Sequence, residues 1–324
     1  MTPASFAANA AARESRMRMI TLLLVAVLGS SSAWAQTGPQ MRTRLLTSLT
    51  NTEVEQYLKR NDVIFIPVGT VEPHGGLPID CEYVGPLAYA IKMAEATDGL
   101  VLPGMAYFFP DATIVGRGAV HVTPSEGTPY LMAVARSLLR QGFRRQVYIT
   151  GHGPSFQTVS PLVRQFYDET HVPIVHLESS AFRRPGPGVA SGAAASPTLP
   201  VPGFSAFDAM LFGAYVIAGR LEDIPVNLAG SVPEHAANPG VNDLFPLGPQ
   251  SGTIGFYMSD ATDHGGAPRP ITSEQRAAIA RAGVEMIEQT VRSFDMKGVL
   301  EAMREHDKFT QQHILPTYGW IFPR

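Results

Sequence analysis

The sequence predicts an α/β fold in which helices cover both faces of a mostly parallel sheet. Short β-rich apolar runs alternate along the chain with stretches of helical periodicity, as expected of successive strand–helix units. The composition agrees, because 45% of the 324 residues are hydrophobic and 16% are charged, so the chain can bury a core and is not intrinsically disordered. This length suits one large domain or two small ones.

The first strand has the clearest pattern. A helix is expected over residues 47–59, where Thr52 can cap the amino terminus and glutamates occupy the first turn. The continuous apolar run over residues 63–68 is typical of a strand buried on both faces. Residues 86–96 then return to helical spacing, which completes a first strand–helix unit.

Further strands and helices follow in the same order. The amphipathic run over residues 128–141 predicts a helix that ends at Gly142. The other elements expected here are a second strand over residues 99–103, a third over 146–150, a helix over 156–170 and a fourth strand over 173–177.

The last third of the chain is less regular. Residues 183–202 are rich in Gly, Pro and Ala and almost uncharged after two arginines, so we expect an irregular insertion or lid segment. We also expect a helix over 206–220, a loop-rich region over 230–270, and a long final helix over 273–297 capped by Thr272 or Ser273.

The first 35 residues resemble an export signal. Three arginines precede an apolar run of ten residues at 19–28, and Ala33-Trp34-Ala35 offers an A-x-A cleavage site. Ten apolar residues are too few to cross a bilayer, which takes about 20 as a helix. We therefore expect a signal peptide over 1–35 and a single domain over 36–324, periplasmic or secreted, with no stable membrane anchor after cleavage.

Charge and cysteine content exclude several classes. The net charge is −3 and no block of Lys and Arg occurs, so a nucleic-acid-binding surface is not expected. The one cysteine, Cys81, excludes an internal disulfide and a cysteine-based zinc site. As a lone thiol in an oxidising compartment, Cys81 is expected to be buried.

Polar side chains follow the first and third predicted strands. Because ligands collect at the carboxyl ends of parallel strands, both groups are expected to face one site. Carboxylates and imidazoles without thiolates are the ligand set of a hydrolytic zinc or manganese site. The expected ligands, for one or two divalent cations per subunit, are Glu72, His74, one of Asp80 and Glu82, and His152.

Two motifs resemble the creatininase (creatinine amidohydrolase) family. The run PVGTVEPHG at residues 67–75, followed by Leu77 and Pro78, is similar to the family motif P-V-G-S-x-E-Q-H-G-x-H-L-P. The run QGFRRQVYITGHG at residues 141–153 is similar to G-F-R-R-x-x-x-x-N-G-H-G-G-N. Residues 234–236, Glu-His-Ala, resemble a third family segment, and the likeness extends over about residues 45–295.

The resemblance implies a three-layer α/β/α amidohydrolase with a binuclear metal site, usually in a homohexamer. The family hydrolyses cyclic or linear amides, including creatinine and formamides. By motif, Glu72 and His152 match ligands of one metal, and His74 matches a ligand of the other. The family's bridging aspartate lies four residues after the L-P proline, which is Glu82 here, with Asp80 as the alternative.

Several positions depart from the family pattern. The glutamate that binds the second metal is replaced by Pro154 in one version of the pattern and by Gly240 in the other. Asp243 or Glu234 would have to substitute, or the site holds a single metal. Ser231 stands where the family has the tryptophan that stacks on creatinine, so creatinine is not the expected substrate.

The same resemblance assigns catalytic and substrate-binding roles. Glu234 or His235 carries a proton to the leaving nitrogen. Asp111 and His264 are weaker candidates for reaching the pocket. Contacts to the substrate are expected from Gly153, Ser155, Tyr107 and His121, with packing as the alternative for Tyr107 and His121.

The sequence therefore predicts a metal-dependent hydrolase, acting as a homo-oligomer on a small molecule. Water activated by the metal would cleave an amide C–N bond, cyclic or linear. The alternative is a protein of the same fold without catalysis, which binds a small molecule or a metal in the periplasm, because expected ligands of the second metal are missing.

Overall fold

A computed structural model describes residues 41–179, 182, 199–227, 255–265 and 269–322. Three expected features lie outside these residues: the signal peptide over 1–35, the catalytic pair Glu234 and His235, and most of the insertion at 183–202. None of the helices in the described part of the chain has the length and apolar character needed to cross a membrane.

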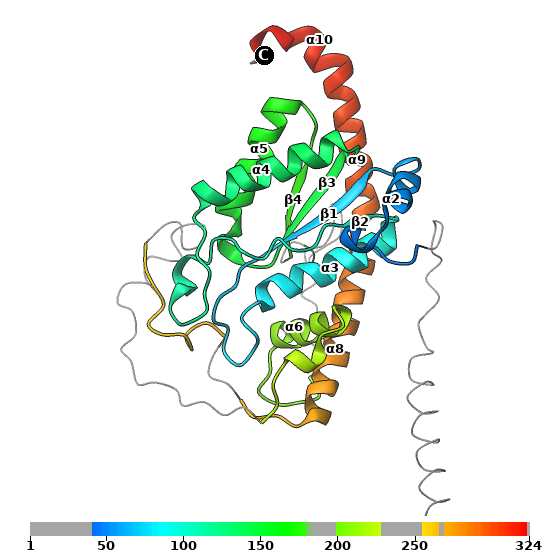
Figure 1. Ribbon diagram of the computed structural model, residues 1–324. Coiled ribbons are helices and arrows are strands. Elements are labelled where there is room, and N and C mark those ends of the chain that lie inside the picture. Colours follow the sequence, from blue (N-terminus) through cyan, green and yellow to red (C-terminus); the bar gives the residue numbers. More distant parts are fainter. Residues whose placement is uncertain (1–40, 180–181, 183–198, 228–254, 266–268, 323–324) are drawn as a thin grey trace, which may run out of the picture. The chain divides into compact units, whose positions relative to one another are not determined.

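A four-stranded sheet stands at the centre of the described residues (Figure 1). Its order is β2-β1-β3-β4, and all neighbouring strands are parallel. β1 and β3 pair along their whole length, from Val63 opposite Arg145 to Val68 opposite Thr150, so both strands end at the same edge. The strands are β1 (Val63–Val68), β2 (Leu100–Val101), β3 (Arg145–Thr150) and β4 (Val175–Glu178).

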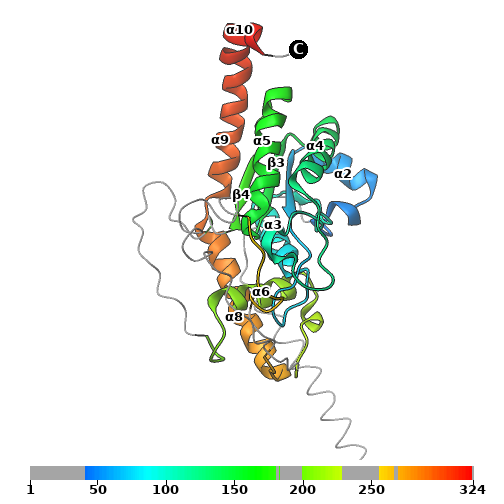
Figure 2. The ribbon, with the colours of Figure 1, turned by 90° about the vertical axis from the view of Figure 1, so that its left-hand side faces the viewer.

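Helices cover both faces of the sheet (Figures 1 and 2), which confirms the predicted α/β fold. Alternate side chains of β1 point to opposite faces, so Ile64 and Ile66 join one core cluster while Val63 and Phe65 join the other. The first cluster includes residues of α2 (Asn51–Leu58), α4 (Pro124–Arg140) and α5 (Phe156–Thr170). The second includes residues of α3 (Cys81–Thr97), α6 (Ala206–Ile217), α8 (Ser273–Ser293) and α9 (Met296–Phe309).

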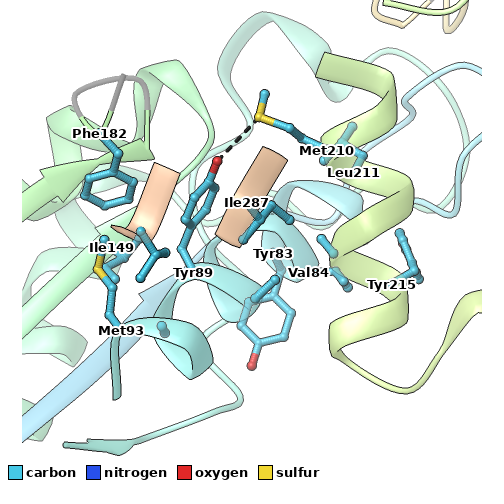
Figure 3. Close-up of a cluster of buried hydrophobic side chains, with 14 of the residues drawn as sticks. Tyr83, Val84, Tyr89, Met93, Ile149, Phe182, Met210, Leu211, Tyr215 and Ile287 are labelled. Atoms are coloured by element: carbon cyan, nitrogen blue, oxygen red, sulfur yellow. Dashed lines mark hydrogen bonds between the residues drawn. The ribbon is translucent and has the colours of Figure 1, made fainter. Parts of the chain in front are cut away.

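The second core cluster joins α3, α6 and α8 into a continuous apolar layer. Figure 3 shows Tyr89 of α3 among Met210, Ile287 and Phe182, with its hydroxyl 3.4 Å from the sulfur of Met210. Each large side chain buried in this way contributes about 1.5–3 kcal/mol to stability. Cys81 is fully buried in the same cluster, as the sequence predicts.

Short helical segments connect the main elements. They are the 3-10 turns η1 (Leu46–Ser48), η2 (Asp111–Ile114), η3 (Gly153–Ser155), η5 (Leu221–Asp223) and η9 (Gly319–Ile321), the π-helical turn η8 (Thr310–Ile314) and the helix α10 (Leu315–Tyr318).

Helix boundaries differ from the sequence prediction in several places: α4 begins at Pro124 instead of residue 128, and α6 ends at Ile217 instead of residue 220. The expected helix over 47–59 is divided, and α2 begins after Thr50, not at Thr52, because Thr50 and Glu53 form a reciprocal capping box. α3 begins at Cys81, well before residue 86. The expected helix over 273–297 ends at Ser293, and α9 begins anew where the side chain of Asp295 accepts a hydrogen bond from the Gly298 amide.

Candidate metal centre

The loop after β1 is held close to the start of α3. A Cβ atom on Gly69 would lie 2.4 Å from the Tyr83 Cα, so only glycine permits this approach. The Glu72 amide donates to the Ile79 carbonyl at 2.8 Å, which folds the loop back on itself. A tight turn with Gly75 in the left-handed region (φ 58°) follows directly after His74. The loop therefore holds Glu72 and His74 beside the first turn of α3.

Three of the predicted ligands converge from three elements. Glu72 comes from the loop after β1, Glu82 from the first turn of α3, and His152 from the end of β3. All three are buried, at 0%, 4% and 4% exposure, respectively. The register of β1 with β3 explains the meeting of Glu72 and His152, since both follow strands that end side by side.

The separations of these three side chains suit a shared cation. His152 Nδ1 lies 3.0 Å from Glu72 Oε1 and 3.9 Å from Glu82 Oε2. Two ligands bonded to one zinc ion at about 2.1 Å stand about 3.0 Å apart at a right angle and about 3.4 Å apart in a tetrahedron. Glu72, Glu82 and His152 thus form a first group with metal-ligand spacing.

A second group shares Glu82 with the first. His74 Nε2 lies 3.1 Å from Glu82 Oε1, the oxygen that is not directed at His152. The His264 ring stacks on the His74 ring with centroids 4.3 Å apart. His74, Glu82 and His264 again offer ligand atoms within 4.8 Å of one another. One oxygen of Glu82 faces each group, as in a carboxylate that bridges two cations.

Buried polar atoms in these groups lack hydrogen-bond partners, although unpaired buried groups are costly. They include Glu72 Oε1 and both ring nitrogens of His74. Burial alone would raise the pKa of Glu82, but the close contact with His74, 3.1 Å away, and the charge of His152 hold this pKa below its usual value. Burial would likewise lower the pKa of His152, yet Glu72 raises it. Two buried carboxylates thus draw positive charge to this site, and the donor set fits a divalent cation.

Thr113 positions Glu72, and no sequence signal indicated it. Its hydroxyl contacts Glu72 Oε2 and the Pro110 carbonyl, which leaves Glu72 Oε1 to face His152. Asp111, at the start of the same short turn, is half-buried with a positive φ of 55°. Burial raises the pKa of Asp111, and the carboxylate of Glu72 adds to that effect.

Asp80 lies outside both groups, which leaves Glu82 as the residue that fits the bridging position. One Asp80 oxygen accepts a hydrogen bond from the Tyr215 hydroxyl at 2.6 Å, and the other accepts one from Arg220 Nη1 at 2.6 Å. Asp80 thereby ties the start of α3 to α6, which is a structural role rather than that of a ligand.

The expected substrate-binding residues are spread over several environments. Gly153 and Ser155 form η3 directly after His152, and the buried hydroxyl of Ser155 has no hydrogen-bond partner. Tyr107 is 58% exposed, so it does not pack in the core. His121 is exposed, with its ring 5.6 Å from that of Phe109. Glu234, His235, Gly240 and Asp243 lie outside the described residues.

Sequence reasoning gave His264 little weight and overlooked Phe207. The His264 side chain is 27% exposed and reaches the centre, with Nδ1 3.7 Å from Glu72 Oε1. Phe207, near the start of α6, also stacks with His74, with ring centroids 5.8 Å apart. The run Asp263-His264-Gly265-Gly266 was the one available signal, because glycines beside a histidine allow close approach of the backbone.

Comparisons with known proteins agree with the motifs. A profile of the creatininase family, described as creatinine amidohydrolase, matches residues 47–208. The 3-dehydro-scyllo-inosose hydrolase of Thermotoga maritima is 30% identical over 111 residues, which cover 34% of this chain and 36% of that protein. This match therefore spans only about a third of the relative's length.

A solved structure shows the same fold. A protein of Bacteroides fragilis NCTC 9343, provisionally named creatinine amidohydrolase, superposes with a TM-score of 0.52 at 16% identity, covering 83% of this chain and 98% of its own. A manganese form of creatininase gives a TM-score of 0.48 at 20% identity, over 78% of this chain and 98% of its own. The family profile covers half of the 324 residues, and the chain therefore belongs to the creatininase family.

Proposed function

We propose that this protein is a metal-dependent hydrolase that cleaves an amide C–N bond, cyclic or linear, in a small molecule other than creatinine. The observation that carries the proposal is the convergence of Glu72, Glu82 and His152, all buried, with ligand atoms within 4.8 Å of one another. Membership of a family whose named relatives are hydrolases supports the same class of reaction.

A divalent cation fits this group on electrostatic grounds. Two carboxylates buried within a few ångströms repel each other, and removing them from water costs several kcal/mol per ion. Glu72, Glu82 and His152 would hold the first cation, which polarises a carbonyl oxygen and lowers the pKa of water to about 7. Zinc and manganese both suit this set of oxygen and nitrogen ligands.

The protein's own residues supply orientation. Thr113 holds one oxygen of Glu72 and so turns the other toward His152. Burial of the ligands keeps bulk water away, which strengthens each electrostatic interaction at the centre. Glu234 or His235 remains the proposed proton carrier to the leaving nitrogen, a role that rests on the family resemblance.

A cyclic polyol ketone is a second candidate substrate class. A cavity of about 40 Å³ borders His74 and Gly265, and its lining includes Asp208 and Arg269. A carboxylate and a guanidinium side by side suit hydroxyl groups, which both donate and accept hydrogen bonds. The relative named for 3-dehydro-scyllo-inosose supports this class.

Export and assembly belong to the same proposal. The basic segment, apolar run and A-x-A site within residues 1–35 support cleavage and release outside the cytoplasm. Amino-terminal sequencing of the protein from cell fractions should give Gln36 as the first residue. Light scattering of the mature protein should show a homo-oligomer.

The central test combines metal analysis with an activity screen. Purified protein should retain divalent metal and hydrolyse a member of a panel of lactams, formamides, lactones and 3-dehydro-scyllo-inosose. Glu72→Ala and His152→Ala should lose both properties, whereas His306→Ala, at an exposed histidine on α9, should lose neither. Stoichiometric metal without hydrolysis would favour the non-catalytic binding protein. Absence of metal, with no effect of either ligand variant, would refute the hydrolase.

A further inference from the structure

The second ligand group is unusual because its third member comes from a late loop. In the family pattern a glutamate two residues after the His152 position binds the second metal, and this chain has Pro154 there. Neither Pro154 nor Gly240, the position in the other version of the pattern, offers a side-chain ligand. Asp243 and Glu234, the expected substitutes, lie outside the described residues, within which Glu82 and His74 alone would give a second cation two protein ligands. We propose that His264 replaces the missing ligand and completes a second divalent-cation site with His74 and Glu82.

The distances place His264 at this site. The centroid of its ring lies 4.3 Å from that of the His74 ring, so the two imidazoles lie side by side. His264 Nδ1 and His74 Nε2 are both buried and have no hydrogen-bond partner. His74 Nε2 in turn lies 3.1 Å from Glu82 Oε1. The His74–Glu82 separation matches two ligands that bind one cation at about 2.1 Å, and the His264 ligand atom lies within 4.8 Å of both.

The loop that bears His264 is built to approach His74. Gly265 has a φ of 85°, and a Cβ atom there would lie 2.2 Å from His74 Nδ1, so only glycine fits. The Met258 amide donates to the Ala112 carbonyl at 3.0 Å, which fixes the other end of the loop beside η2. The Asp260 and Asp263 carboxylates accept hydrogen bonds from the Thr262 and Ser259 amides.

Packing alone does not account for this arrangement. A buried imidazole nitrogen without a partner costs about 1–3 kcal/mol, and here His74 and His264 present such atoms side by side. An aromatic residue without ring nitrogens could stack on His74 equally well, as Phe207 does at 5.8 Å. A cation bound by His74, His264 and Glu82 would give one unpaired nitrogen of each imidazole a partner.

The two sites should differ in affinity. Glu72, Glu82 and His152 are fixed by a strand end, a helix and a strand end, whereas the second site depends on the loop at 255–265. Holding that loop in place costs conformational entropy, so the second cation binds more weakly. This inference rests on the proposed metal centre, because Glu82 serves both cations.

The experiment is metal titration of the full mature chain after removal of metal by chelation. Zinc binding followed by calorimetry, with metal content measured after gel filtration, should show two unequal equivalents. His264→Ala and His264→Gln should each keep the tighter equivalent and lose the weaker, with affinity reduced more than about 100-fold, since loss of a second-shell partner already costs about 10–100-fold. His313→Ala, at an exposed histidine of η8, should keep both equivalents.

The outcomes separate this inference from the hydrolase proposal. Two equivalents retained in both His264 variants, or a single equivalent in the wild-type protein with activity that depends on Glu72, would overturn the role of His264 alone. No zinc bound by the wild-type protein would overturn both proposals. If the metal-free variants give the same unfolding curves as metal-free wild-type protein, a folding defect is excluded as the cause of any loss of zinc binding.

Discussion

The two ends of the central strands carry charged clusters of opposite character. At the amino end, Asp307 of α9 accepts two hydrogen bonds from Arg144 at 2.5 and 2.8 Å, and Arg145 Nη1 lies 3.1 Å from the same carboxylate. At the carboxyl end, Glu72 and Glu82 face imidazoles, and several buried nitrogen and oxygen atoms have no partner. The same two strands, β1 and β3, therefore begin beside a carboxylate paired with guanidinium groups and end beside carboxylates that face imidazoles.

This difference separates a structural cluster from a functional one. Guanidinium groups carry a permanent charge, so the Asp307 carboxylate at the amino end is neutralised within the protein, although Arg145 Nε and Nη1 there make no hydrogen bond. Imidazoles carry at most a partial charge at neutral pH, so the carboxyl end keeps excess negative charge for a cation. Incomplete satisfaction of buried groups is expected where a protein binds a ligand.

The largest effect is expected at the carboxyl end, at the residue shared by both ligand groups. Glu82→Gln preserves the shape of the side chain and removes the charge that both cations need. Hydrolysis should fall about 1000-fold or more, since loss of one stabilising donor already costs about 100–1000-fold in other enzymes. The metal-free variant should unfold at an equal or higher denaturant concentration than wild type, because a buried charge is gone. A loss of stability without loss of metal would contradict the comparison.

At the amino end of the strands, a substitution is expected to lower stability and to leave metal binding unchanged. Asp307→Asn removes the nearer carboxylate of Arg145, which is 8% exposed, and leaves the longer contact to Asp62 at 3.7 Å. The free energy of unfolding should fall by about 3 kcal/mol, as for a broken buried ion pair. Metal content should stay at the wild-type value. Chemical denaturation and metal analysis of one preparation test both statements, and an unchanged midpoint would show that the pair is structurally neutral.

A smaller effect concerns the pH dependence of stability. Burial lowers the pKa of His176 on β4 from 6.5 to about 4. Between these values the unfolded chain binds a proton that the folded protein rejects, so this contribution to stability is lost as the pH falls from 6.5 toward 4. Between pH 6.5 and 5 the loss should be about 2 kcal/mol.

The variant His176→Gln isolates the contribution of His176 to the pH dependence of stability. A glutamine amide can still donate to Thr150 Oγ1, which lies 2.9 Å from His176 Nε2. Denaturation at pH 6.5 and pH 5 should show a shallower dependence in the variant than in wild type, with both proteins in the same metal state. Equal slopes would mean that His176 titrates as if exposed.

The smallest effect is expected at Thr113. Thr113→Val keeps the volume and removes the hydroxyl that holds Glu72 Oε2. Metal affinity should drop about 10-fold, at the low end of the range for outer-shell partners. Thr128→Val, at another buried threonine whose hydroxyl contacts the Thr158 carbonyl, is the matched control and should leave affinity unchanged. Equal affinities in both variants would remove Thr113 from the centre.

Much of the fold followed from local patterns. The run over 63–68 gave β1 with its observed bounds, and the amphipathic stretch over 156–170 gave α5, because burial on one or both faces leaves a periodic trace in the sequence. The predicted helix boundaries were less accurate than the predicted presence of each element. Thr50 caps α2 instead of Thr52, and α3 starts before Pro86, since these details depend on side-chain hydrogen bonds and on contacts with distant segments.

The metal centre, like the fold, could be predicted from the sequence only in part. Strand ends and motifs in the sequence by themselves predicted that Glu72, His74, His152 and one of Asp80 and Glu82 meet at one edge of a parallel sheet. Each buried strand leaves an apolar run in the sequence, and the carboxyl ends of parallel strands lie at the same edge. Only the tertiary structure decided that Asp80 turns to Arg220 and Tyr215, and that Thr113 and His264 reach Glu72 from remote loops. The physical reason is that a loop's path is set by packing and by where a glycine such as Gly265 admits close contact, and neither leaves a period in the sequence.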